Sequence, residues 1–133
     1  MIIVLDTSVL VAAQITTTGT CADVVKLTLR EHRLVLSDHI LEEFERTMVR
    51  KLRYPAEAAR SFVTDYRAVS ALVTPVQADP NLCRDPADAA ILGTALAAKA
   101  DMLVTVDKDL LDITAKVGVD IVNPREFFRR THS

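Results

Sequence analysis

The sequence predicts an α/β fold in a single domain, with a parallel sheet that helices cover on both faces. Short runs of apolar residues alternate along the chain with longer segments of helical composition, as in successive βαβ units. The short runs are largely apolar throughout instead of at every second position, which is typical of parallel strands buried on both faces. A chain of 133 residues has the length of one domain, so residues 1–133 are expected to form one unit.

Short apolar runs, rich in branched side chains, mark the predicted strands. The first is the sequence IIVL, close to the start of the chain, and the fourth contains LVTV. In chain order, the predicted strands are Ile2–Leu5, Leu34–Leu36, Leu72–Val76, Met102–Val106 and Val119–Val122.

Segments of helical composition fill the gaps between these strands. Short oxygen-bearing side chains and proline favour a first helical turn, and they stand where three of the helices should begin, at Ser37 or Asp38, at Pro55 and at Pro86. In the fifth helix, small residues form a narrow face, Ala90, Gly93, Thr94 and Ala97, that can pack close to the sheet. In chain order, the predicted helices are Val9–Ala13, Cys21–Arg30, His39–Leu52, Ala56–Ser70, Pro86–Lys99 and Asp109–Lys116.

Composition excludes several classes of protein. Hydrophobic residues make up 50% of the chain, too many for disorder, yet no apolar run reaches the roughly 20 residues of a membrane helix. Met1 leads directly into an apolar run without a basic region, so we expect no signal peptide, no membrane contact and a cytoplasmic protein. Cys21 and Cys83 lack zinc-ligand spacing, which favours reduced thiols. The net charge of -2 means that any RNA contact must be local.

Four acidic residues are expected to gather at one edge of the sheet. Asp6 and Asp107 each directly follow a predicted strand, and ligands of open α/β sheets bind beyond the carboxyl ends of the strands. Asp88 lies in the first turn of the fifth helix, near the positive end of its dipole. Glu43 lies at the border of the buried stripe of the third helix.

Each of these acids also has a purely structural interpretation. Asp6 and Asp88 are suitable helix caps, and Asp107 suits a turn before the next helix. Glu43 has the spacing for an exposed ion pair with Arg46, three residues further along the same helix. The chemical interpretation therefore depends on whether the four carboxylates converge.

Converging carboxylates repel one another, so they persist only with protons or a divalent cation. A site made only of oxygen ligands, without cysteine or histidine, suits Mg²⁺ or Mn²⁺. Such ions assist phosphodiester hydrolysis by lowering the pKa of water and neutralising charge on the phosphate. The positive residues Arg46, Arg50 and Arg53 follow Glu43 at helical spacing, and they are either a contact for an RNA backbone or a solvated helix face.

Four stretches of the chain resemble the PIN-domain ribonucleases, in particular the toxin component of VapBC-type toxin–antitoxin systems. They are VLDTSVL, SDHILEEFERTM, DPADAAILGTALAAKADMLVTVDKDLL and IVNPREF, in the order found in that family. The resemblance implies a five-stranded parallel sheet and an Mg²⁺- or Mn²⁺-dependent endoribonuclease. It also implies a small antitoxin as partner and suggests a homodimer.

The same resemblance assigns roles to individual residues. It implies catalytic and metal-binding acids at Asp6, Glu43, Asp88 and Asp107, with hydroxyl groups near them at Thr7, Ser8 and Thr105. The chain also offers Asp85 beside Asp88 and Asp109 beside Asp107. Asp85 either reaches a second metal through water or caps the helix that begins at Pro86. The alternative to an enzyme is a catalytically silent PIN-like module that binds RNA or protein.

Overall fold

A five-stranded parallel sheet forms the centre of the computed structural model, which describes residues 1–132. The strand order is β3-β2-β1-β4-β5, so β1 is central and pairs with β2 on one side and β4 on the other. The strands are β1 (Ile2–Leu5), β2 (Arg33–Leu36), β3 (Ala71–Leu72), β4 (Met102–Val104) and β5 (Asp120–Val122).

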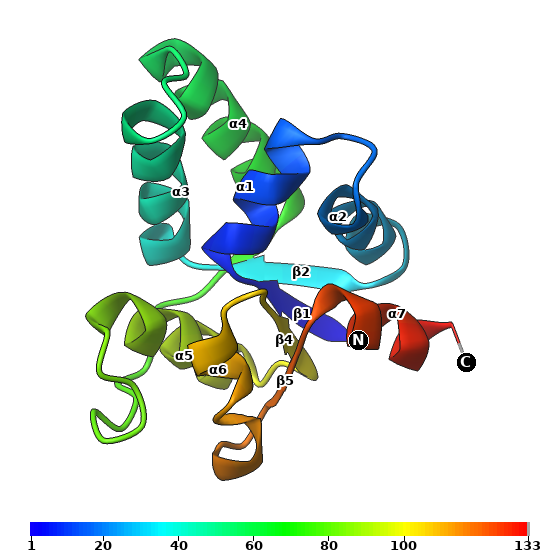
Figure 1. Cartoon of the computed structure of the whole chain (residues 1–133), viewed down its shortest axis with the longest axis vertical. Coiled ribbons are helices and arrows are strands. Elements are labelled where there is room, and N and C mark those ends of the chain that lie inside the picture. The colour runs from blue at the N-terminus through cyan, green and yellow to red at the C-terminus, as the bar shows by residue number, and fades with distance from the viewer. Residues whose placement is uncertain (133) are drawn as a thin grey trace.

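Helices cover both faces of this sheet. The chain steps outward from β1 to β2 and β3, then returns past β1 to β4 and β5. Because crossovers between parallel strands are right-handed, the reversal of direction places the later helices on the opposite face. Figure 1 shows α1 to α4 on one side of the sheet and α5 and α6 on the other. The helices are α1 (Thr7–Ile15), α2 (Thr20–Glu31), α3 (Asp38–Arg50), α4 (Ala56–Val69), α5 (Pro86–Ala98), α6 (Lys108–Leu111) and α7 (Pro124–Thr131).

The core lies between the central strands and these two helical layers. Ile3, Val4 and Leu5 of β1 are completely buried, as expected for a strand covered on both faces. Phe44 of α3 is also fully buried and packs edge-on against Tyr66 of α4, with ring centroids 5.4 Å apart. The predicted α/β fold, with five parallel strands and helices on both faces, is confirmed. The expected domain 1–133 extends one residue beyond the described part of the chain.

The third strand is much shorter than predicted. Only Ala71–Leu72 belongs to the sheet, so the predicted strand Leu72–Val76 is wrong beyond its first residue. The backbone N–H of Val73 still donates to the carbonyl of Leu36, at 3.0 Å, but that of Val76 donates to the carbonyl of Gly93 on α5, at 3.1 Å. Pro75, between them, has no N–H to offer a neighbouring strand. The chain therefore leaves the sheet here and crosses over α5.

The small-residue face of α5 serves this crossover. Thr94 does point toward the sheet end, where its hydroxyl donates to the buried Ser37 hydroxyl at 2.8 Å. Gly93, expected to face the sheet, instead meets the crossover: a Cβ atom built on it would lie 2.1 Å from the carbonyl oxygen of Val76. Only a residue without a side chain allows this approach.

Near the C-terminus, one predicted helix is wrong and one helix was not predicted. The predicted helix Asp109–Lys116 is wrong as one piece, because α6 ends at Leu111 and a separate 3₁₀ turn, η1 (Thr114–Lys116), follows. Helix α7 is not among the sequence predictions. Its signals are local: the Asn123 side chain accepts from the N–H of Glu126 at 2.8 Å, and Pro124 occupies the first turn.

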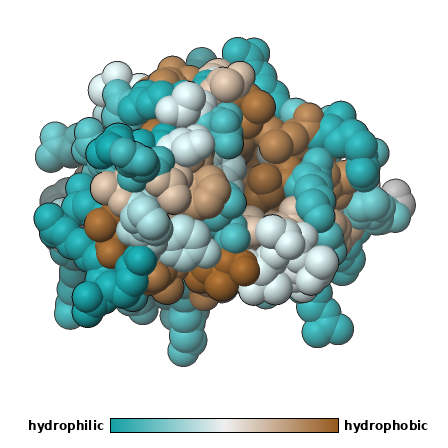
Figure 2. Space-filling model, turned by 90° about the horizontal axis from the view of Figure 1, so that it is seen from above, coloured by the Kyte–Doolittle hydropathy of each residue, from teal (hydrophilic) through white to brown (hydrophobic). Residues whose placement is uncertain are grey.

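The face of the molecule formed on the side of α1 to α4 carries both hydrophilic and hydrophobic residues. Figure 2 shows hydrophilic residues around the periphery of this face and hydrophobic residues in a hollow nearer its centre. Within residues 1–132, no single helix is long and apolar enough to cross a membrane. One pair, α1 with α2, meets that criterion by length and composition when taken together, and it is bent by 109° at the break.

Candidate metal centre

An acidic cleft opens at the carboxyl ends of β1 and β4, between α1, α3 and α5. Its volume is about 540 Å³. The sheet topology explains its position, because β1 and β4 are neighbours and parallel, so the segments that follow them emerge side by side. Five acidic side chains line the cleft: Asp6, Glu43, Asp85, Asp88 and Asp107.

Asp6 is the most deeply buried of these acids, with 4% of its surface exposed. It stands at the N-cap position of α1, yet its side chain makes no capping hydrogen bond. Its Oδ2 atom instead accepts from the hydroxyls of Ser8, at 2.8 Å, and Thr105, at 2.6 Å. Burial raises the pKa of Asp6, and the two hydroxyl donors act against that rise by stabilising the charged form. The hydroxyls of Ser8 and Thr105 therefore hold the Asp6 carboxylate, and this carboxylate does not cap α1.

Thr105 links Asp6 to Asp107. The Thr105 hydroxyl is completely buried and donates to Asp6, and it accepts from the backbone N–H of Asp107 at 2.9 Å. Asp107 is the N-cap of α6, and its Oδ1 accepts from the N–H of Asp109 at 2.9 Å. The expected turn role of Asp107 is therefore correct, and its carboxylate lines the cleft as well.

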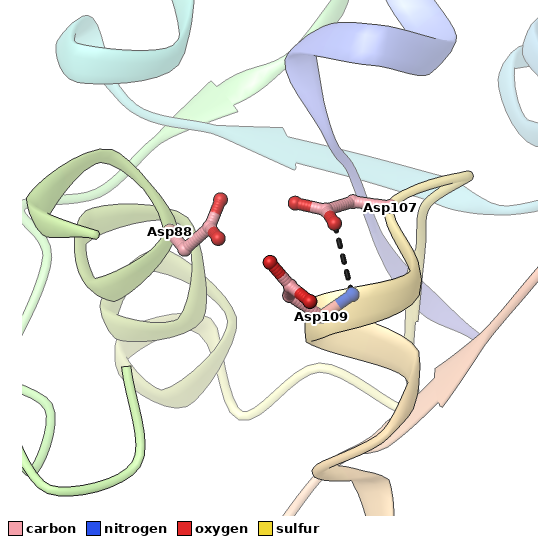
Figure 3. A group of neighbouring side chains, drawn as sticks. All are labelled: Asp88, Asp107 and Asp109. Carbon is pink, nitrogen blue, oxygen red and sulfur yellow. Dashed lines mark hydrogen bonds between the residues drawn. The ribbon is translucent and has the colours of Figure 1, made fainter. Parts of the chain in front are cut away.

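Asp88 faces Asp107 and Asp109 across the cleft (Figure 3). One carboxylate oxygen of each of these three residues lies within 4.8 Å of the other two. Burial, the charges of Asp107 and Asp85, and more weakly that of Asp6, raise the pKa of Asp88 to about 7. Asp109 is exposed, and it enters the cluster from the first turn of α6. The tightest acidic group thus contains Asp109, which the sequence offered only as an alternative.

Glu43 joins the cleft from α3 but belongs to its wall rather than to this tight group. The side chain of His39, one turn earlier, lies beside it, with 3.6 Å between His39 Nε2 and Glu43 Oε2. The alternative pairing with Arg46 is absent from the ion pairs formed within residues 1–132. The Glu43 side chain therefore lines the cleft without pairing with Arg46.

Asp85 has the structural role that its position before Pro86 suggests. It is the N-cap of α5, where its Oδ1 accepts from the N–H of Ala87 at 2.9 Å. Its side chain also lines the cleft, so its charge contributes to the raised pKa of Asp88.

Of the three predicted basic residues, two lie beside the cleft and one lies away from it. Arg46 and Arg50 line a hollow of about 200 Å³ beside the cleft, together with Glu43, Thr47 and Lys51. Arg53 follows the end of α3 in a left-handed conformation with φ of 61°, and it lines neither the cleft nor this hollow.

Lys51 was missed by the sequence analysis, although it lines the acidic cleft itself. The sequence does contain a spacing that indicates this position of Lys51. Residues four apart share a helix face, so Glu43, Thr47 and Lys51 form one line along α3 and its end.

The donor set fits a hard divalent cation. Carboxylate oxygens from α5 and from the segment after β4 converge, and the pKa of Asp88 is raised first by burial and then by the neighbouring carboxylate charges, whose repulsion a cation would relieve. Thr7 adds a second observation, since it lines the cleft and its buried Oγ1 has no hydrogen-bond partner within the described chain. Oxygen ligands without cysteine or histidine suit Mg²⁺ or Mn²⁺.

The raised pKa of Asp88 predicts how stability depends on pH. The folded state holds this proton more tightly than the unfolded chain, whose aspartates have a pKa near 3.8. The resulting stabilisation is complete below about pH 4 and is lost as the pH rises through about 7. In chelator, wild type should therefore lose melting temperature between about pH 5 and about pH 7.5 relative to Asp88→Asn. An equal change of melting temperature in the two proteins between these pH values would contradict this expectation.

Comparisons with known proteins bear on this geometry. The PIN domain family matches residues 2–109 of the sequence. No curated protein matches the chain in sequence. The fold is similar to that of VapBC2 from Rickettsia felis, solved bound to a DNA fragment from their promoter, with a TM-score of 0.67, 16% identity, and 92% of this chain and 98% of that chain covered.

A second solved structure, VapBC-1 from nontypeable Haemophilus influenzae, gives a similar result. The TM-score is 0.66 at 16% identity, and the alignment covers 94% of this chain and 99% of that chain. At such low identity the structural likeness concerns the fold alone, whereas the sequence match spans β1 to α6, the part of the chain that supplies every acidic residue of the cleft. The chain belongs to the PIN domain family.

Proposed function

We propose that this protein is an Mg²⁺- or Mn²⁺-dependent endoribonuclease and the toxin of a toxin–antitoxin pair. The observation that carries the proposal is the convergence of Asp6, Glu43, Asp88 and Asp107 in one cleft, with a pKa of about 7 for Asp88. Structural roles alone do not account for this arrangement, because like charges packed together destabilise the fold unless a ligand compensates.

The chain's own residues prepare the cleft for a cation. Ser8 and Thr105 fix the orientation of the Asp6 carboxylate, and Thr105 also holds the backbone at Asp107. Asp88 comes from the opposite wall on α5, so the ligands are carried by different elements of a rigid scaffold. A divalent cation held there lowers the pKa of water and neutralises the charge that develops on a phosphate during hydrolysis.

Two observations favour RNA as substrate. The resemblance to PIN-domain ribonucleases implies it, and positive side chains stand at the border of the acidic cleft. Arg46 and Arg50 share a hollow with Glu43, and Lys51 lines both that hollow and the cleft. Positive residues beside an acidic metal site offset the repulsion between the acids and an approaching phosphate.

An antitoxin as partner is supported by the similar structures, which are VapBC proteins, and by the walls of the cleft. Ile15 and Val106 line it, and 50% and 52% of their surfaces are exposed. A protein segment placed over this apolar rim would bury it and close access to the acids. The homodimer suggested by the resemblance stays a prediction, which the mass of the protein in solution tests.

Metal-dependent cleavage is the test of the proposed activity. The purified protein should cut single-stranded RNA with Mg²⁺ or Mn²⁺, and a chelator should abolish cutting until excess metal restores it. Gel analysis of a 5′-labelled oligonucleotide reports the cuts. Undiminished cutting in chelator would exclude the metal mechanism. RNA binding without cutting at any metal concentration would identify the silent binding module instead.

A further inference from the structure

Three neighbouring hollows follow one another along α3. The acidic cleft shares Glu43, Thr47 and Lys51 with the hollow of about 200 Å³ that also contains Arg46 and Arg50. The same two arginines line a third hollow, of about 260 Å³, between α3 and α4. The shared residues place the three hollows next to one another along α3, and we call the row that they form the groove.

The far part of this groove is strongly basic. Four exposed cations line it beyond the cleft, and we call them the basic groove: Arg46, Arg50, Lys51 and Arg60. Arg60 is contributed by α4, and sequence analysis gave it no role. None of the four takes part in an ion pair formed within residues 1–132, whereas Arg67 on the same helix α4 pairs with Asp38 at 2.7 Å.

The charge pattern fits a polyanion that begins at the acidic cleft. Arg50 lies seven positions after Glu43 on α3, which corresponds to about 10 Å along the helix axis. Beyond the acids the lining is basic, with Glu45 as the only acidic side chain of the third hollow in the described chain. Unpaired guanidinium groups bind phosphate through several N–H donors in a fixed geometry.

We propose that the basic groove holds the strand of a single-stranded RNA as it leaves the acidic cleft, with Arg60 as a phosphate contact away from the scissile bond. This inference rests on the proposed function, because it takes the cut phosphodiester to lie at the acids. The cleft has the volume of a pocket for one small ligand, and an unpaired strand is narrow enough to bring a phosphodiester into it. The strand then continues along α3 to the α3–α4 hollow.

Substrate length provides the test. With Mn²⁺ present, Arg60→Gln should raise KM about tenfold for a ten-nucleotide RNA and by less than about twofold for a dinucleotide, with little change in kcat. The slope of log KM against log salt for the long RNA should fall by about 0.7, the value for one lost phosphate contact on a single strand. A merely structural role for Arg60 would affect both lengths equally, and that result would overturn the proposal.

A matched control removes the same charge elsewhere. Arg125 is exposed on α7, which Figure 1 shows far from α3 and α4, and it takes part in no ion pair within residues 1–132. Arg125→Gln should leave KM for both RNAs at the wild-type value. An equal rise of KM in Arg125→Gln and Arg60→Gln would mean that the rise comes from the lower net charge of the protein. That result would contradict the proposed role of the basic groove.

A binding assay separates this inference from the proposed activity. Fluorescence anisotropy of the labelled ten-nucleotide RNA is measured in an Asp6→Asn background, with and without Arg60→Gln. Weaker binding with Arg60→Gln supports the basic groove even if wild type cuts nothing. Normal cutting by wild type with equal RNA binding by the two variants, or no RNA binding by Asp6→Asn itself, overturns it. Decaglutamate should not displace the RNA, and equal displacement would identify a site for acidic protein segments instead.

Discussion

Asp6→Asn should lower the rate of RNA cleavage on the order of a thousandfold, which corresponds to about 4 kcal/mol of lost transition-state stabilisation. Asparagine keeps the size of the side chain and one oxygen, but it removes the negative charge that a divalent cation requires. Asp6 is the most buried acid of the cleft, so water cannot easily replace the lost ligand. Single-turnover cleavage at saturating Mn²⁺ is the measurement, because it reports chemistry without product release.

Glu42→Gln is the matched control for this variant. It removes one carboxylate next to Glu43 in sequence, but Glu42 is exposed and lies outside the lining of the cleft. Its cleavage rate should stay within about twofold of wild type, as for an ordinary surface change. If Asp6→Asn also keeps wild-type activity, a contaminating nuclease or a different active site accounts for the cleavage.

The hydroxyl of Thr105 should matter less than the acid that it holds. Thr105→Val keeps the shape of the side chain and removes the donor to Asp6 and the acceptor for Asp107 N–H. Loss of such an orienting group costs about 10- to 100-fold in metal affinity or activity. Mn²⁺ affinity, measured by calorimetry, is therefore the suitable readout, and excess Mn²⁺ should partly restore the cleavage rate of Thr105→Val.

The sequence predicted the parts of the fold that depend on repeated local patterns. The run Ile2–Leu5 is a strand over its predicted length, because a short, fully apolar segment rich in branched residues suits the centre of a covered sheet. The convergence of Asp6 and Asp107 was expected for the case that their strands are neighbours, and β1 and β4 do lie side by side in the sheet. Their roles as cation ligands stay a prediction.

What the sequence could not predict depends on contacts between distant segments. The apolar residues Val73 and Val76 read as strand, but β3 ends before them because the carbonyl of Gly93, on α5, provides an alternative hydrogen-bond partner. The entry of Asp109 into the acidic cluster depends on the tight turn in which Asp107 caps α6, a geometry that spacing alone does not fix. The basic groove likewise requires α4 beside α3, which places Arg60 near Arg46.

The crossover at Gly93 leads to the second large prediction: Gly93→Ala should lower the free energy of unfolding by about 3 kcal/mol. The new Cβ atom would lie 2.1 Å from the carbonyl oxygen of Val76, so the backbone must move apart. That movement stretches the hydrogen bond from Val76 N–H to the Gly93 carbonyl and disturbs the packing of Pro75. The gain from the higher helix propensity of alanine, about 1 kcal/mol, is too small to compensate.

Gly118→Ala tests whether the loss of stability comes from the close contact between Gly93 and Val76 and not from the replacement of a glycine as such. No atom lies within 4 Å of a Cβ at Gly118, and its φ is not positive, so alanine should stabilise the protein by about 0.4 to 1 kcal/mol through the unfolded chain. Urea denaturation of both variants and wild type gives the comparison. Because α5 carries Asp88 five residues before Gly93, a displaced α5 should also weaken Mn²⁺ binding in Gly93→Ala and not in Gly118→Ala. Wild-type stability in Gly93→Ala would mean that residues 73–76 can leave α5 without cost, and the close contact would then have no part in placing the acidic cleft.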